Sequence, residues 1–92
     1  MQMEEKRVGV IGAGTMGAGI SQTFAQSGYK VELVDVDEKQ LPHALREIGR
    51  NLLRLASKGV IDPTKVDTIL GRIRMFPHID LLTPAPLIVE TV

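Results

Sequence analysis

Residues 8–20 of this chain, Val-Gly-Val-Ile-Gly-Ala-Gly-Thr-Met-Gly-Ala-Gly-Ile, decide its fold. A short apolar strand over 7–11 runs directly into the glycine-rich segment 12–17, and a second apolar strand is predicted over 31–34. Asp35 stands at the end of that second strand, 18 positions after Gly17. Strand, G-x-G-x-x-G, helix, strand and acid in this order form a dinucleotide-binding fingerprint. A glycine-rich turn without a ligand is the alternative interpretation.

Each position of the fingerprint has its own physical task. Gly12 permits a tight turn, Gly14 lets the backbone approach a pyrophosphate, and Gly17 lets the next helix pack closely on the sheet. The helix N-terminus presents free N–H groups and a partial positive charge to phosphates. Asp35 would accept hydrogen bonds from the adenosine ribose, which favours NAD over NADP. The candidate cofactor-binding residues are Gly12, Ala13, Gly14, Thr15, Met16, Gly17 and Asp35.

Composition excludes several classes of function. The chain has 11 basic and 11 acidic residues, so no net field recruits nucleic acid or a membrane surface. It has no cysteine, which excludes disulfides and thiolate chemistry. No apolar run approaches the roughly 20 residues that span a bilayer. The first seven residues lack the apolar core of a signal peptide and include two acids. We therefore expect a cytoplasmic protein that binds neither nucleic acid nor membrane.

A helix is predicted over 16–27, with Met16, Ile20 and Phe24 as its buried stripe and Gly28 as its stop. The next connection, 36–72, is long enough for two helices. The first is predicted to begin at a capping box formed by Asp37 and Gln40, or at Pro42, and to end at Lys58.

The rest of this connection predicts a helical hairpin. Along the first helix the apolar positions form a narrow seam suited to packing on another helix: Leu41, Leu45, Ile48, Leu52 and Leu55. Asp62 followed by Pro63 predicts an N-cap and the start of a second helix that ends near Leu70. We expect the two helices to pack antiparallel and to project beyond the sheet.

The remaining residues predict two more strands, over 73–76 and from Leu87 onward, with a proline-rich loop over 77–86. The predicted fold is therefore α/β, a Rossmann-type parallel sheet of order 3-2-1-4 with the hairpin inserted between its second and third strands. The sequence stops within the fourth strand. We expect the chain to be part of a longer protein.

Few residues outside the fingerprint suggest chemistry. Arg46, Arg50, Arg54 and Lys58 recur every four residues, either as a solvated basic face or as a site for a phosphorylated ligand. His43 and His78 are the only histidines, and neither has a carboxylate or hydroxyl placed as an evident relay. No metal-ligand cluster and no convincing general acid or base is predicted.

The fingerprint at 8–20, Val34-Asp35, the long hairpin and Leu-Ile-Val-Glu-Thr-Val at 87–92 together resemble the L-3-hydroxyacyl-CoA dehydrogenases, and bacterial 3-hydroxybutyryl-CoA dehydrogenases most. The resemblance covers essentially the whole chain. It implies that residues 1–92 form the N-terminal part of an NAD-binding domain, without the C-terminal helical domain through which the family dimerises. It also implies hydride transfer between NAD and the 3-hydroxyl or 3-keto group of an acyl-CoA.

Through the same resemblance, Asn51 and Lys58 fall on positions that contact CoA. The family's catalytic serine, histidine, glutamate and asparagine lie beyond Val92, so no catalytic residue is assigned and the fragment alone is predicted to be inactive. Two alternatives stay open. One is a non-catalytic nucleotide-binding or interaction module that self-associates through its last strand, and the other is a Rossmann dehydrogenase for a sugar or hydroxy acid.

Overall fold

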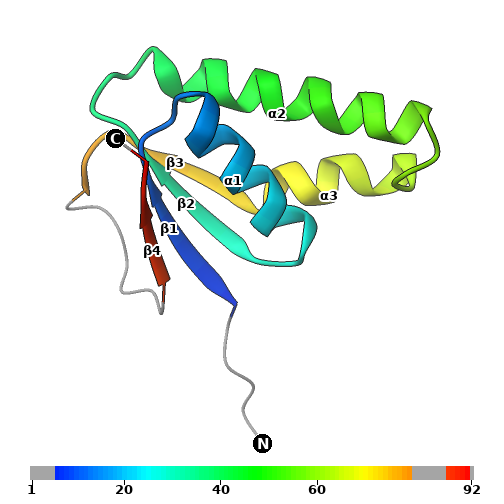
Figure 1. Cartoon of the computed structure of the whole chain (residues 1–92), viewed down its shortest axis with the longest axis horizontal. Helices are drawn as coiled ribbons and strands as arrows, with labels where there is room; N and C mark the ends of the chain where they lie inside the picture. The colour runs from blue at the N-terminus through cyan, green and yellow to red at the C-terminus, as the bar shows by residue number, and fades with distance from the viewer. Residues whose placement is uncertain (1–5, 80–86, 92) are drawn as a thin grey trace, which may run out of the picture.

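The computed structural model describes residues 6–79 and 87–91, in which a parallel sheet is covered by helices on one face (Figure 1). The strands are β1 (Arg7–Ile11), β2 (Lys30–Val34), β3 (Ile73–Phe76) and β4 (Leu87–Glu90). Their order is β3-β2-β1-β4, and every neighbouring pair is parallel. Both the Rossmann-type order and the four predicted strands are thus confirmed.

The core lies between the sheet and the helices. Val8 pairs with Val31 and Val10 pairs with Leu33, so these four side chains share one face of the sheet. All four are at most 1% exposed. Short β-branched and leucine runs of this kind are typical of parallel strands under a helical layer.

The first helix, α1 (Thr15–Gln26), buries a different face from the predicted one. Its buried residues are the small ones: Gly17, Ala18, Ser21 and Ala25. Met16 is 66% exposed, while Ile20 and Phe24 are only partly buried against the core. The predicted buried stripe was therefore wrong for Met16, whereas Ile20 and Phe24 are partly buried, as two of its members. Close packing at the glycine turn brings the smallest side chains to the sheet and leaves the larger ones at its margin.

The long helix, α2 (Gln40–Ser57), begins between the two predicted starts, with Lys39 as its N-cap, and the capping box is wrong. The backbone N–H of Asp37, which that motif would engage, donates to Asp35 Oδ1 instead (2.8 Å). The Asp37 carboxylate accepts the N–H of Lys39 (3.1 Å). The helix ends at Ser57 with Lys58 as its C-cap, and Gly59 follows with a positive φ of 75°, which suits a residue without Cβ.

The return half of the hairpin consists of η1 (Pro63–Lys65), a 3₁₀ turn, followed by α3 (Val66–Gly71). The Asp62 carboxylate accepts hydrogen bonds from the Thr64 backbone N–H and hydroxyl, both 2.9 Å. These bonds lower the pKa of the Asp62 carboxyl from its usual value because they favour the charged form, and the bond from the backbone N–H has the larger effect. The predicted N-cap is confirmed, although it opens a 3₁₀ turn before the α-helix.

The predicted packing of the hairpin is found in part: Leu45 and Leu55 of the predicted seam are only half-buried, and Ala44, which was not predicted, is buried. On α2 the buried residues are Leu41, Ala44, Ile48 and Leu52, and on α3 they are Val66 and Ile69. Figure 1 shows α2 and α3 running side by side past the end of α1. Most of the loop predicted over 77–86 lies outside the described residues.

Candidate functional site

The glycine turn joins β1 to α1 at the carboxyl edge of the sheet. Gly12 has a φ of 105°, a conformation that other residues rarely adopt. A Cβ at Gly17 would lie 1.7 Å from the Gly12 carbonyl oxygen, so the turn and the helix meet at a distance that only glycine allows. A Cβ at Gly14 would meet nothing within 4 Å. The turn is therefore closed on the side of Gly17 and open on the side of Gly14.

The N-terminus of α1 is built to receive an anion. Gly14 is its N-cap and supplies no side-chain cap, and the first turn contains no acidic residue. The first hydrogen bond across the cap runs from the Ala18 N–H to the Gly14 carbonyl (2.9 Å). The N–H groups of residues 14–17, which precede this bond, have no partner within the helix. The helix dipole adds partial positive charge at the same end. This geometry fits the pyrophosphate of a dinucleotide.

Asp35, at the tip of β2, lies against the glycine turn. Its Oδ2 accepts the backbone N–H of Ala13 (2.9 Å), and its Oδ1 accepts that of Asp37. The N–H of Gly12 donates to the carbonyl of Val34 beside it (2.7 Å). A carboxylate offers about four acceptor positions, so about two remain for hydroxyl groups of a ligand. The structure thus brings together the two halves of the predicted cofactor site.

A small apolar pocket of about 260 Å³ adjoins this carboxylate. It is lined by Ile11, Gly12, Val34, Asp35, Val36 and Ile79. Val36 is 79% exposed and Ile79 is 53% exposed. Sequence reasoning missed both residues, although Val36 directly follows Asp35. Ile79 is near them only because the fold pairs β3 with β2.

Thr91, just past β4, contacts the same turn from the other side. Its hydroxyl lies 3.0 Å from the Ile11 carbonyl oxygen and 3.2 Å from that of Gly12. Its backbone N–H also donates to the Ile11 carbonyl (2.9 Å). Nothing in the sequence singled out Thr91, since its role depends on β4 lying beside β1.

A second cleft, of about 430 Å³, separates the start of α1 from α2. Its lining includes Gly14 and Thr15 from the turn, and His43, Glu47 and Asn51 from one side of α2. The Asn51 amide also donates to Gln22 Oε1 on α1, at 3.4 Å. Asn51 therefore lies close to the predicted cofactor turn, as a shared site requires.

Lys58 does not line this cleft. It follows α2 seven residues after Asn51, which is about 10 Å further along the helix axis on nearly the same face. The other basic positions, Arg46, Arg50 and Arg54, are exposed on α2. Arg50 forms an exposed ion pair with Glu47 (3.0 Å), which partly neutralises the predicted basic face.

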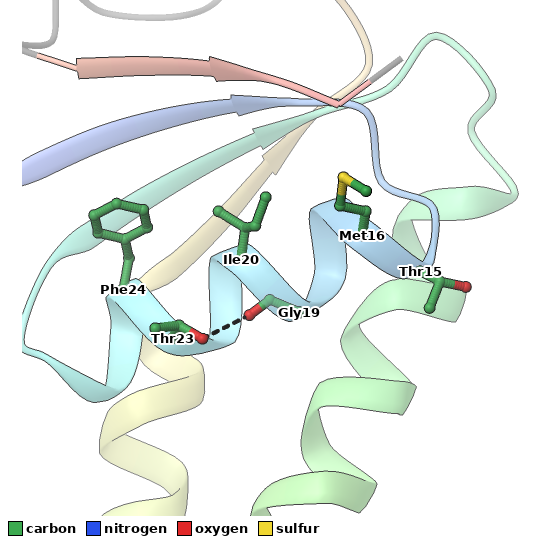
Figure 2. Close-up of a pocket in the computed structure, with 6 residues that line it drawn as sticks. All are labelled: Thr15, Met16, Gly19, Ile20, Thr23 and Phe24. Atoms are coloured by element: carbon green, nitrogen blue, oxygen red, sulfur yellow. Dashed lines mark hydrogen bonds between the residues drawn. The ribbon is translucent and has the colours of Figure 1, made fainter.

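A further pocket of about 460 Å³ lies along α1, and its lining begins with Thr15 and Met16 of the glycine turn. Figure 2 shows Met16, Ile20 and Phe24 pointing to the same side of the helix, with Thr23 donating a hydrogen bond to the Gly19 carbonyl (3.0 Å). These are the three residues predicted as the buried stripe. The pocket is shallow and largely apolar, and it contains no charged group.

Among the residues that the structure describes, neither histidine has a partner that suggests catalysis. His43 is exposed at the rim of the α1–α2 cleft, and His78 is exposed after β3. Within residues 6–79 and 87–91, no group of three or more potential metal ligands lies together. None of the helices in these ranges combines the length and apolar character needed to cross a bilayer.

Residues 7–92 match the family model described as "3-hydroxyacyl-CoA dehydrogenase, NAD binding domain". The chain is 40% identical over 86 residues to a 3-hydroxybutyryl-CoA dehydrogenase of Bradyrhizobium diazoefficiens, covering 94% of this chain and 29% of that protein. It is 33% identical over 90 residues to a probable 3-hydroxybutyryl-CoA dehydrogenase of Bacillus subtilis, covering 98% of this chain and 31% of the relative.

Solved structures agree with this result. The crystal structure of (S)-3-hydroxybutyryl-CoA dehydrogenase PaaH1 from Ralstonia eutropha superposes with a TM-score of 0.89 at 30% identity. The match covers 96% of this chain and 31% of that one. The chain therefore spans about a third of the length of the curated relatives it matches.

Proposed function

This chain belongs to the 3-hydroxyacyl-CoA dehydrogenase family, as its NAD-binding domain, and on this premise we propose that it is the cofactor-binding part of a 3-hydroxybutyryl-CoA dehydrogenase. The complete enzyme would transfer a hydride between NAD and the 3-hydroxyl or 3-keto group of an acyl-CoA. When bound, oxidised NAD would accept the hydride, and NADH would donate it in the reverse direction. Residues 1–92 would form the N-terminal part of the dinucleotide-binding domain, and the catalytic groups and a helical dimerisation domain would belong to the remainder of the enzyme.

The observation that supports this proposal most is the uncapped glycine turn with Asp35 at its side. Its residues Gly12, Ala13, Gly14, Thr15, Met16 and Gly17 would surround the pyrophosphate. Asp35 would accept the adenosine ribose hydroxyls. The apolar pocket beside Asp35 suits a flat adenine ring, which would cover the exposed side chains of Val36 and Ile79.

Titration of the 92-residue chain with NADH, followed by the fluorescence of the nicotinamide, tests the proposal directly. We expect saturable binding, and weaker binding of NADPH, because the 2′-phosphate would meet the Asp35 carboxylate. A chain that binds neither dinucleotide would contradict the proposed function. We also propose that the protein acts in the cytoplasm, in keeping with its lack of cysteine.

For the acyl-CoA we propose contacts at Asn51 and Lys58. Asn51 lines the cleft next to the glycine turn, and Lys58 lies further along the same side of α2. An exposed ammonium group attracts phosphate oxygens, although the gain at a solvated site is small. The exposed basic residues of α2 add to this attraction. We propose no nucleic-acid partner, since the basic and acidic residues of the chain are equal in number.

Replacing Lys58 by alanine should weaken the binding of free CoA by about two- to fivefold, the range of one exposed charge contact. Asn51→Ala should weaken it by about two- to tenfold, the range of one hydrogen bond. Isothermal titration with CoA measures both. Lys65→Ala is the matched control, since it removes an equally exposed lysine from the other half of the hairpin. Equal losses in Lys58→Ala and Lys65→Ala would indicate non-specific attraction instead.

A second candidate property is self-association through β4, beside the homodimer that we propose for the complete enzyme. In the described sheet β4 pairs only with β1, and Leu87 and Ile88 are 43% and 53% exposed. An open strand edge with apolar side chains favours pairing with another chain. Light scattering over a hundredfold range of concentration should show a rising mean mass, whereas a constant monomer mass would rule out edge pairing.

A further inference from the structure

The glycine turn is held by two strands that approach it from opposite sides. On the side of β2, the N–H groups of Gly12 and Ala13 donate to the Val34 carbonyl and the Asp35 carboxylate. On the side of β4, the Thr91 hydroxyl lies within hydrogen-bonding distance of the Ile11 and Gly12 carbonyls. One strand thus engages the donors of the turn, and the other engages its acceptors.

Thr91 acts at the point where the turn leaves least room. The Gly12 carbonyl is the group that a Cβ at Gly17 would strike, and the Thr91 hydroxyl lies 3.3 Å from that same Cβ position. A hydroxyl has one hydrogen to donate, so it serves the two carbonyls in turn or shares its hydrogen between them. Either arrangement resists rotation of the Ile11–Gly12 and Gly12–Ala13 peptide units.

The orientation of these peptide units decides where the turn directs its N–H groups. Binding sites that are already ordered before the ligand arrives avoid the entropic cost of ordering during binding. We propose that Thr91 is a positioning residue for the cofactor, one that keeps the glycine turn in its binding conformation without touching the cofactor itself. The effect on cofactor affinity rests on the proposed function, whereas the ordering of the turn does not.

Thr91→Val tests this proposal, because it replaces the hydroxyl by a methyl group of similar size, and Thr91→Ser restores the hydroxyl. Thr23→Val is the matched control. It removes a hydroxyl that also donates to a backbone carbonyl, that of Gly19, but within α1 and away from the turn. Three quantities are measured for each variant: amide hydrogen exchange without cofactor, the Kd of NADH, and the free energy of unfolding in urea.

In Thr91→Val we expect exchange at the amides of Gly12, Ala13 and Ala18 to quicken by about three- to tenfold, the range of one neutral hydrogen bond. The Kd of NADH should rise by a similar factor. Thr91→Ser should return both values to within about twofold of the original chain, and Thr23→Val should leave both unchanged.

Two results would overturn the proposal. One is unchanged exchange and affinity in Thr91→Val. The other is faster exchange at amides throughout the sheet in proportion to a loss of global stability, which would make Thr91 an ordinary structural residue. If the original chain bound no NADH, the proposed function would fail separately, and the local exchange at the turn would still decide whether Thr91 orders it.

Discussion

Gly17→Ala should unfold the glycine turn and abolish measurable NADH binding. A Cβ at this position would lie 1.7 Å from the Gly12 carbonyl oxygen and 2.8 Å from its carbon. Both atoms belong to the backbone, so the clash cannot be relieved by a side-chain rotation. We expect a loss of about 3 kcal/mol or more in the free energy of unfolding, at the upper end for overpacking. In a domain of this size that lowers Tm by roughly 12–24 °C in a thermal melt.

Two other glycines of the same segment provide controls. Gly19 lies on the same helix, and a Cβ there would meet nothing within 4 Å. Gly19→Ala should therefore stabilise the chain by up to about 1 kcal/mol through helix propensity. Gly14→Ala should keep the fold, since the φ of −72° at this position suits alanine. It should nevertheless weaken the binding of NADH, because the added methyl group crowds the approach of the pyrophosphate. A Gly17→Ala chain that melts like the original would mean that α1 and the turn are further apart than described.

Asp35→Ala should weaken NADH binding by about 1.5–3 kcal/mol, the range for a hydrogen bond to a charged group. This corresponds to a Kd about 10- to 150-fold higher in a fluorescence titration. The ratio of NADH to NADPH affinity should fall as well, because the carboxylate that disfavours the 2′-phosphate is gone. Asp37→Ala is the matched control: it removes a nearby exposed carboxylate whose only described bond is to the Lys39 N–H in the same loop.

The two cofactors also separate the two tasks of Asp35. Its carboxylate holds the Ala13 N–H, so its removal loosens the turn as well as the ribose site. A looser turn would lower the affinities for NADH and NADPH by the same factor, whereas a lost ribose contact would lower the affinity for NADH alone. An unchanged Kd for NADH in Asp35→Ala would exclude Asp35 from the cofactor site.

The local signals of the sequence proved sufficient for most of the fold. Gly28 and Gly59 end helices with positive φ, and Asp62 with Pro63 begins the return half of the hairpin. Such signals depend on the conformation of a few neighbouring residues, so they can be interpreted without knowing the rest of the molecule. Periodicity was less reliable for α1, where Met16 has helical spacing with Ile20 and Phe24 but lies mainly in solvent.

The failed capping box has a local cause. Asp37 and Gln40 have the right spacing, but the Asp37 N–H donates to a carboxylate at the tip of the preceding strand. The motif thus lost its donor to an acid only two residues earlier in the chain, and the helix begins later, with Lys39 at its N-cap. Because an N–H group donates mainly to one acceptor, competition between nearby side chains decides such motifs.

By itself the sequence determined the glycine turn, the acid that faces it, the order of elements and the presence of the hairpin, because each of these follows from local conformation and spacing. Only the tertiary structure decided which groups surround the turn. Thr91 and Ile79 reach the site because the strands are parallel, so that their carboxyl ends meet at one edge of the sheet. Neighbours of this kind are set by strand pairing between residues far apart in the chain, and a pattern along the sequence does not record them.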